Sequence, residues 1–186
     1  MPVLTGKSVE EEAVLQVAKL MAISARTAPK SKGIDDIEVA IVHGEELEKI
    51  AKKMEELANK TGDRNYTRDA NSVRQSYAIV LIGVHGRRPL GMNCGLCGFE
   101  SCEEFLNAKV IDRGMLRGPL CVFKLLDLGI ALGSAVKTAS LHNVDNRMMF
   151  RIGTAARLLG LLECDLIIGI PLAATGKSPF FDRKET

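Results

Sequence analysis

The sequence contains no tryptophan and only two tyrosines, and aromatic residues make up 4% of its 186 residues. This scarcity argues against the stacking surface that binds single-stranded nucleic acid. Neither sign of charge dominates, because 25 basic and 23 acidic residues leave a net charge of +2. We therefore expect no nucleic-acid partner and no electrostatic attraction to a membrane.

Long hydrophobic runs are also missing. No apolar run approaches the roughly 20 residues that cross a bilayer, because charged residues or glycines interrupt each of them. Residues 1–8 lack the apolar core and the small-residue cleavage site of a signal peptide. We therefore expect a cytoplasmic protein, in which thiols stay reduced.

The length and composition are those of one globular domain. With 186 residues, 46% of them apolar, the chain is long enough to bury a core without disulfides. Hydrophobic periodicity predicts alternating helices and strands, which indicates a layered α/β or α+β domain. The predicted helices cover residues 9–25, 45–60, 125–141 and 145–161, with short helices within 61–75 and 102–109; the predicted strands cover 37–42, 77–84 and 165–170, with a tail from Pro171 onward.

Four of the five cysteines lie between Cys94 and Cys121, in a segment rich in glycine. Their pattern is Cys-x2-Cys-x4-Cys, followed after eighteen residues by the last cysteine. Gly95 and Gly98 permit the positive φ angles of a tight turn. Cys102 is expected at the start of a short helix, where the helix dipole favours a thiolate. Because a cuboidal cluster needs four converging thiolates, the pattern favours a [4Fe-4S] site.

Other interpretations of these cysteines are open. Structural zinc sites of the ribbon type usually pair two Cys-x2-Cys knuckles, and this chain has one. A redox-active thiol pair would leave two cysteines without a role, and the plainest interpretation is four unligated cysteines in a loop. Cys164 lies beside an apolar stretch and is expected in the core. His85, which precedes the cysteine segment, is expected to face solvent.

The arrangement Cys-x2-Cys-Gly-x3-Cys with a distal cysteine resembles the four-cysteine [4Fe-4S] domain of corrinoid iron–sulfur proteins. Nearly the whole chain resembles an uncharacterised bacterial and archaeal family of ferredoxin domain-containing proteins with a nitroreductase-like fold. The resemblance implies one α+β domain over residues 1–186, with a cysteine-rich iron–sulfur segment inserted at residues 91–122. It also implies the cluster ligands, which are Cys94, Cys97, Cys102 and Cys121.

Two further segments are similar to nitroreductases, which are FMN enzymes and homodimers. Ala25-Arg-Thr-Ala-Pro-Lys-Ser-Lys-Gly33 lies where that family has its early flavin-binding loop, and Ile168-Gly-Ile-Pro171 is similar to its C-terminal strand. The resemblance implies an FMN phosphate held by basic and hydroxyl side chains, since arginine supplies paired donors. The residues in question are Arg26, Lys30, Ser31 and Lys32. A solvated basic loop is the alternative.

Together these features predict a cytoplasmic iron–sulfur protein for electron transfer or oxidoreduction, and they leave open whether FMN is a second cofactor. Its expected partners are a second copy of itself, forming a homodimer, and a redox partner protein. The alternative is a non-catalytic module that binds metal or senses oxidation, with a structural zinc ion or cluster. Whether the protein is an enzyme is open at this point, because the sequence identifies no general acid or base.

Overall fold

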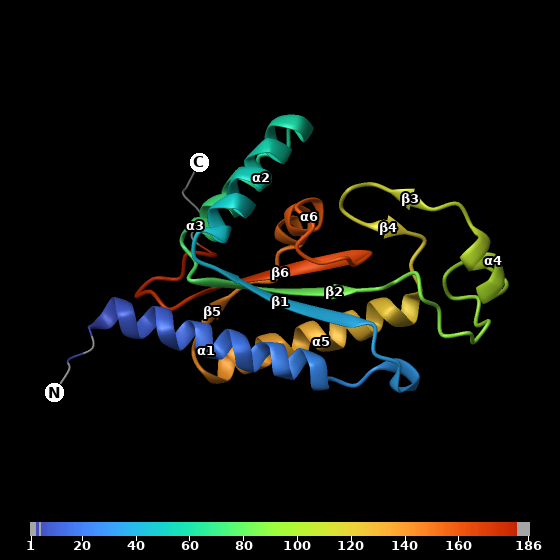
Figure 1. Ribbon diagram of the computed structural model, residues 1–186, viewed down its shortest axis with the longest axis horizontal. Helices are drawn as coiled ribbons and strands as arrows, with labels where there is room; N and C mark the ends of the chain where they lie inside the picture. The colour runs from blue at the N-terminus through green and yellow to red at the C-terminus, as the bar shows by residue number, and fades with distance from the viewer. Residues whose placement is uncertain (1–2, 4, 182–186) are drawn as a thin grey trace.

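The computed structural model describes residues 3 and 5–181, which fold around a four-stranded antiparallel sheet (Figure 1). Across the sheet the strands are β1 (Ile37–His43), β2 (Ala78–Val84), β6 (Leu166–Ala173) and β5 (Asp145–Asn146). β2 pairs along its whole length with β1 on one side and with β6 on the other. Every residue of β2 is buried, because both faces of the sheet are covered. An unbroken apolar run is the expected sequence for such a strand.

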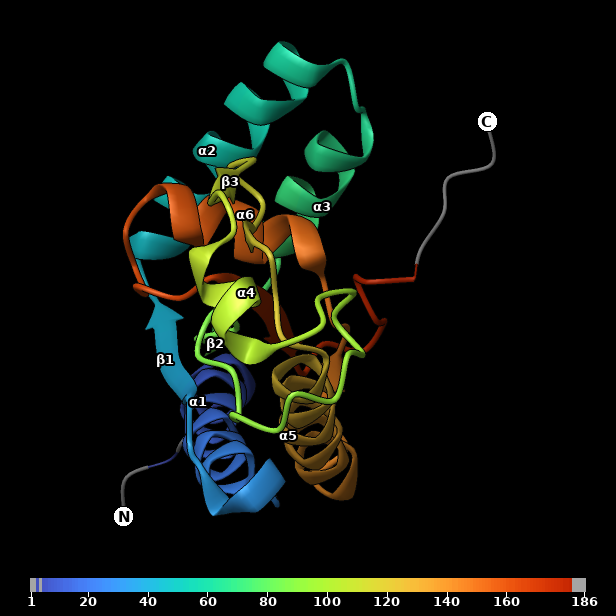
Figure 2. The same ribbon diagram turned by 90° about the vertical axis from the view of Figure 1, so that its right-hand side faces the viewer.

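Helices cover both faces of the sheet (Figures 1 and 2). The helices on one face are α1 (Gly6–Thr27) and α5 (Val122–Leu141). The helices on the other are α2 (Glu46–Thr61), α3 (Asn65–Arg74) and α6 (Phe150–Leu158). Adjacent residues of β2 serve different layers: Leu81 packs with α2 and α6, and Ile82 packs with α1 and α5. The predicted α+β class is confirmed. Within the described part of the chain, no helix combines the length and apolar character that crossing a membrane requires.

α6 lies in direct contact with β6, and glycines make this closeness possible. A Cβ atom added at Gly153 would lie 1.8 Å from the carbonyl oxygen of Ile167. A Cβ atom added at Gly169 would lie 2.2 Å from the Cγ2 atom of Ile152. Since real Cβ contacts are longer than 3 Å, neither position has room for a side chain.

Two predicted elements near the C-terminus are wrong. The helix expected over residues 145–161 is instead β5 followed by α6, because β5 pairs with the end of β6. The tail expected from Pro171 begins three residues later, because residues 171–173 are the last part of β6. Gly169 exchanges two backbone hydrogen bonds with Met149 on the β5 side. Pro171 directs its nitrogen to that same side, so its missing N–H interrupts only the short pairing with β5.

The cysteine-rich segment leaves the sheet at the end of β2, returns at the start of α5, and projects from one end of the sheet (Figure 1). It contains α4 (Cys102–Asn107) and a hairpin of β3 (Ile111–Asp112) and β4 (Arg117–Gly118). Asp165 fastens the segment to the sheet. Its carboxylate is 2% exposed and accepts hydrogen bonds from Nε of Arg117 at 2.6 Å and from the backbone N–H of Arg87 at 2.9 Å.

Candidate metal centre

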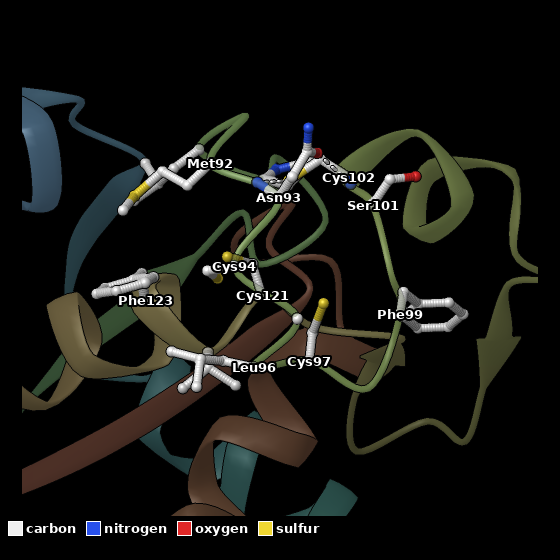
Figure 3. Close-up of a pocket in the computed structure, with 14 residues that line it drawn as sticks. Met92, Asn93, Cys94, Leu96, Cys97, Phe99, Ser101, Cys102, Cys121 and Phe123 are labelled. Atoms are coloured by element: carbon white, nitrogen blue, oxygen red, sulfur yellow. Dashed lines mark hydrogen bonds between the residues drawn. The ribbon is translucent and has the colours of Figure 1, made fainter.

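Four of the five cysteines line a single pocket at this end of the sheet (Figure 3). Cys94 and Cys97 come from the loop after β2, Cys102 begins α4, and Cys121 directly precedes α5. The rest of the wall is largely apolar and includes Leu96, which lies next to Cys97 in the chain. The structure thus brings together the four thiols that the sequence singles out.

The loop that carries Cys94 and Cys97 depends on positive φ angles. Gly95 and Gly98 have φ angles of 72° and 85°, as the sequence predicts. The backbone N–H of Gly98 donates to the carbonyl of Gly95 at 2.9 Å. A side chain at either position would strain the backbone. The glycines therefore permit a turn tight enough to present two thiols from four consecutive residues.

Asn93 connects this loop to Cys102, and sequence reasoning missed it. Its Oδ1 atom accepts a hydrogen bond from the N–H of Cys102 at 2.8 Å, and its own N–H donates to the Cys102 sulfur at 3.4 Å. An N–H directed at sulfur stabilises the thiolate and tunes a sulfur-ligated metal. The signal in the sequence is an asparagine directly before the first cysteine, since asparagine tolerates the φ of 48° observed here.

Cys121 is the most buried of the four, with 6% of its surface exposed. Its N–H donates to the carbonyl of Gly86 at 2.8 Å, which joins the end of the cysteine segment to its beginning. It is also the N-cap residue of α5, so it lies at the positive end of the dipole of a 20-residue helix. Cys94, by contrast, is exposed. The four thiols therefore extend from the solvent to the interior.

No three of the four sulfurs, all of them in the described part of the chain, lie within 4.8 Å of one another. Zinc in a four-cysteine site binds each sulfur at about 2.3 Å, which places neighbouring sulfurs about 3.8 Å apart. Among the described residues, one group of three potential metal ligands lies within 4.8 Å of one another, and it contains none of these four cysteines. Four thiols around one pocket suit either a zinc ion or an iron–sulfur cluster.

The basic loop that follows α1 directs its side chains at the protein itself. Arg26 forms an ion pair with Asp35 at 2.7 Å. Lys30 donates to two backbone carbonyls in the last turn of α1. Lys32 donates to the carbonyl of Leu90 at 3.3 Å. The positive charges expected to hold a phosphate are thus engaged in internal contacts.

Ser31, the fourth residue expected at the flavin phosphate, binds a carboxylate. Its N–H and its hydroxyl both donate to Oδ1 of Asp127 on α5, at 2.8 Å and 2.7 Å. Asp127 is 1% exposed, and its Oδ2 atom has no hydrogen-bond partner among the described residues. A phosphate beside Ser31 would face this carboxylate and be repelled. In this arrangement the loop does not fit an FMN phosphate, and the flavin site stays a prediction.

A second cavity of about 400 Å³ adjoins the cysteine pocket. Phe99 lines both cavities, and its ring makes an edge-to-face contact with buried Phe105, with ring centres 5.7 Å apart. The lining is apolar except for Lys109 and Arg113. Apolar walls with a few placed charges are typical of small-molecule sites. A small molecule here would lie against Phe99, which also lines the cysteine pocket.

Solved structures show which fold this is. A nitroreductase with bound FMN from Desulfitobacterium hafniense aligns with a TM-score of 0.56 and 15% identity, over 87% of this chain and 78% of that one. Nitroreductase CinD from Lactococcus lactis, in complex with chloramphenicol, aligns with a TM-score of 0.59 and 10% identity, over 95% of this chain and 84% of that one. The scaffold is therefore the nitroreductase fold.

Sequence comparisons show the family. Residues 117–183 match the model described as "Uncharacterized protein containing a ferredoxin domain (DUF2148)", a range that includes Cys121 and begins after the other three cysteines of the pocket. An uncharacterised protein of Archaeoglobus fulgidus is 54% identical over 180 residues, which cover 97% of each chain. The chain belongs to the same protein family as this Archaeoglobus fulgidus relative.

Proposed function

We propose that this protein transfers electrons through a [4Fe-4S] cluster held by Cys94, Cys97, Cys102 and Cys121. The observation that carries the proposal is the convergence of these four thiols, from three separate elements, on one pocket. The single Cys-x2-Cys pair favours a cluster over a ribbon-type zinc site, which usually has two such pairs. The ferredoxin-domain description of the matching family model supports the same chemistry.

The chain's own residues would prepare this site for a negatively charged centre. The N–H of Asn93 already donates to the Cys102 sulfur, and Cys121 lies at the positive end of α5. Both features stabilise thiolates, which are the form that binds iron. When bound, such a cluster supplies single-electron transfer at a potential set by hydrogen bonds to sulfur and by solvent exposure.

A redox partner protein would approach from the exposed side of the pocket. Met92 and Leu96, which flank Cys94 in the chain, are 46% and 59% exposed and line the pocket. Apolar side chains at a rim of this kind give a transient partner a contact surface close to the redox centre. Electrons would enter and leave one at a time on this side.

Anaerobic purification followed by iron, sulfide and zinc analysis tests the proposal. We expect about four iron and four sulfide per chain, with a broad visible absorption that dithionite bleaches. A colourless protein whose four cysteines hold one zinc ion would overturn electron transfer. That result would favour the non-catalytic alternative, in which the metal acts as a structural clip.

A nitroreductase of the same fold contains bound FMN, but the basic loop of this chain does not fit an FMN phosphate. Because Ser31 is bonded to Asp127 and the basic side chains are engaged, we expect no saturable binding of FMN. Quenching of flavin fluorescence during titration measures this. Saturable quenching would contradict the expectation, and its loss in Lys30→Ala would locate the phosphate at the basic loop.

We infer a homodimer that forms through the outer faces of α1 and α5. Ile23 on α1 and Ile130 on α5 are 59% and 46% exposed, and the two helices pack side by side (Figure 2). Large apolar side chains gathered on one surface are typical of subunit interfaces.

We expect light scattering to give twice the mass of one chain for the wild type, and the mass of a single chain for Ile130→Glu. Lys60→Glu, on the opposite layer, is the control and should stay dimeric; an Ile130→Glu dimer would contradict this interface.

A further inference from the structure

Three potential metal ligands meet outside the cysteine pocket. Glu38 comes from β1, His85 directly follows β2, and Cys164 precedes β6. One ligand atom from each lies within 4.8 Å of the other two, and no other group of this kind occurs among the residues that the structure describes. The three lie at the end of the sheet from which the cysteine segment projects (Figure 1).

These side chains can meet because a glycine in β2, Gly83, leaves room for them. Glu38 pairs directly with Gly83 across β1 and β2. A Cβ atom at Gly83 would lie 2.7 Å from the sulfur of Cys164, so the glycine opens the space that the thiol occupies. His85 is two residues beyond Gly83, and in a strand that spacing returns to the same face. His85 is not the solvent-facing loop residue that the sequence predicts, because its side chain is only 13% exposed.

The hydrogen bonds around the group hold its backbone but leave the thiol open. The N–H of His85 donates to the carbonyl of Asp36 at 3.0 Å, and the N–H of Asp165 donates to the carbonyl of Val84 at 3.0 Å. The Nε2 atom of His85 lies 2.5 Å from Oε1 of Glu38. Among the described residues, the Cys164 sulfur makes no hydrogen bond that would compete with a metal.

We propose that Glu38, His85 and Cys164 bind one zinc ion, at a site separate from the four-cysteine centre. A thiolate, an imidazole and a carboxylate are together the ligands that zinc prefers, whereas magnesium and calcium select oxygen alone. In tetrahedral zinc sites ligand atoms lie roughly 3–4 Å apart. The ion would therefore replace the contact between His85 and Glu38 and draw the three ligand atoms slightly closer together.

The three proposed ligands differ in how far they are exposed to solvent. Cys164 is 2% exposed, whereas the side chain of Glu38 is 45% exposed. Three protein ligands leave the fourth position of zinc open, and water would fill it from the side of Glu38. The charges of Arg88 and Arg117 repel the zinc ion only weakly, because Arg88 is paired with Asp36 and Arg117 with Asp165.

The ion would cross-link the base of the cysteine segment. It would join β1, the end of β2 and the residue that leads into β6. His85 is followed by Gly86, whose carbonyl accepts the N–H of Cys121. Zinc at this position would therefore fix the strand end against which the most buried cluster ligand is held.

Zinc content after equilibrium dialysis tests the proposal, with His85→Gln compared against His43→Gln. His43 is an exposed histidine at the end of β1 and is the matched control. The protein is purified anaerobically and kept with whatever its four cysteines hold. We expect the wild type and His43→Gln to bind one zinc ion more than His85→Gln. Loss of a residue that hydrogen-bonds to a metal ligand lowers metal affinity by up to about a hundredfold. Loss of a ligand itself should therefore lower the affinity for zinc by at least that factor.

Cys164→Ser provides a second variant, and it should lose the same single zinc ion. Iron content is measured in every sample, so that failure of the cluster proposal is seen separately. If the four cysteines bind zinc instead of iron, every total rises by one and the difference between His85→Gln and His43→Gln persists. Equal zinc contents in these two variants, or full zinc content in Cys164→Ser, would overturn the proposal.

Discussion

Replacing Cys121 by serine is expected to lower the iron content of the anaerobically purified protein from about four atoms per chain to near zero. Cys121 is the ligand that lies deepest, and its backbone is held by Gly86. A serine hydroxyl stays protonated at neutral pH and is a poor ligand for iron, so the buried corner of the site would have no anion to close it. Iron and sulfide analysis with the visible spectrum measures the loss.

Cys164→Ser is the control for this experiment. It makes the same chemical change in a buried cysteine, and Cys164 does not line the pocket. We expect its iron content to stay near that of the wild type, because the four cluster ligands are unchanged, although the variant removes a ligand of the proposed zinc ion. Burial raises the pKa of the Cys164 thiol to about 12, so it is protonated at neutral pH when no metal binds it and does not offer a substitute ligand to iron. Full iron in Cys121→Ser would contradict the assigned ligand set.

Gly153→Ala is expected to have the largest effect on stability. The added Cβ atom would lie 1.8 Å from the carbonyl oxygen of Ile167, so α6 must move off β6. Overpacking a core typically costs about 1–3 kcal/mol. Because backbone meets backbone here and cannot rotate away, we expect at least about 3 kcal/mol, out of a total stability of about 5–15 kcal/mol. Urea unfolding followed by circular dichroism measures this.

Gly129→Ala separates the effect of contact from that of helix propensity. Gly129 also lies within a helix, α5, but nothing lies within 4 Å of where its Cβ would be. Alanine is favoured over glycine in a helix by about 1 kcal/mol. We therefore expect Gly129→Ala to unfold at slightly higher urea than the wild type. A loss of stability similar to that of Gly153→Ala would refute the explanation by close contact.

The sequence predicts the large elements well, because their information is local. The apolar run that ends at Val84 indicates a buried strand, and the amphipathic spacing of residues 45–60 indicates a helix; both are found within one or two residues of the expected ends. The sequence does not predict β5, because a strand of two residues is too short to show alternating hydrophobic and polar positions. The sequence also does not predict that β6 continues through Pro171. Whether a strand can contain proline depends on which neighbouring strand the proline nitrogen faces, and the order of strands in the sheet sets that.

The candidate site is predictable only in part, for the same reason. Four clustered cysteines reveal themselves by spacing alone. The role of Asn93 depends on a loop conformation, and the group formed with Cys164 depends on strand register between distant segments. For the basic loop, the sequence predicts a site that the structure does not support. Its composition suits a phosphate, but Ser31 is bonded to Asp127, which lies 96 residues away in the chain.

The hydrogen bond between Cys121 and Gly86 brings the two ends of the cysteine segment to one point. The segment is thus a closed loop, which Asp165 also holds to the sheet through Arg87 and Arg117, and the cost of closing a flexible loop rises only slowly with its length. Insertions or deletions within this loop are therefore expected to cost the sheet and its helices little stability.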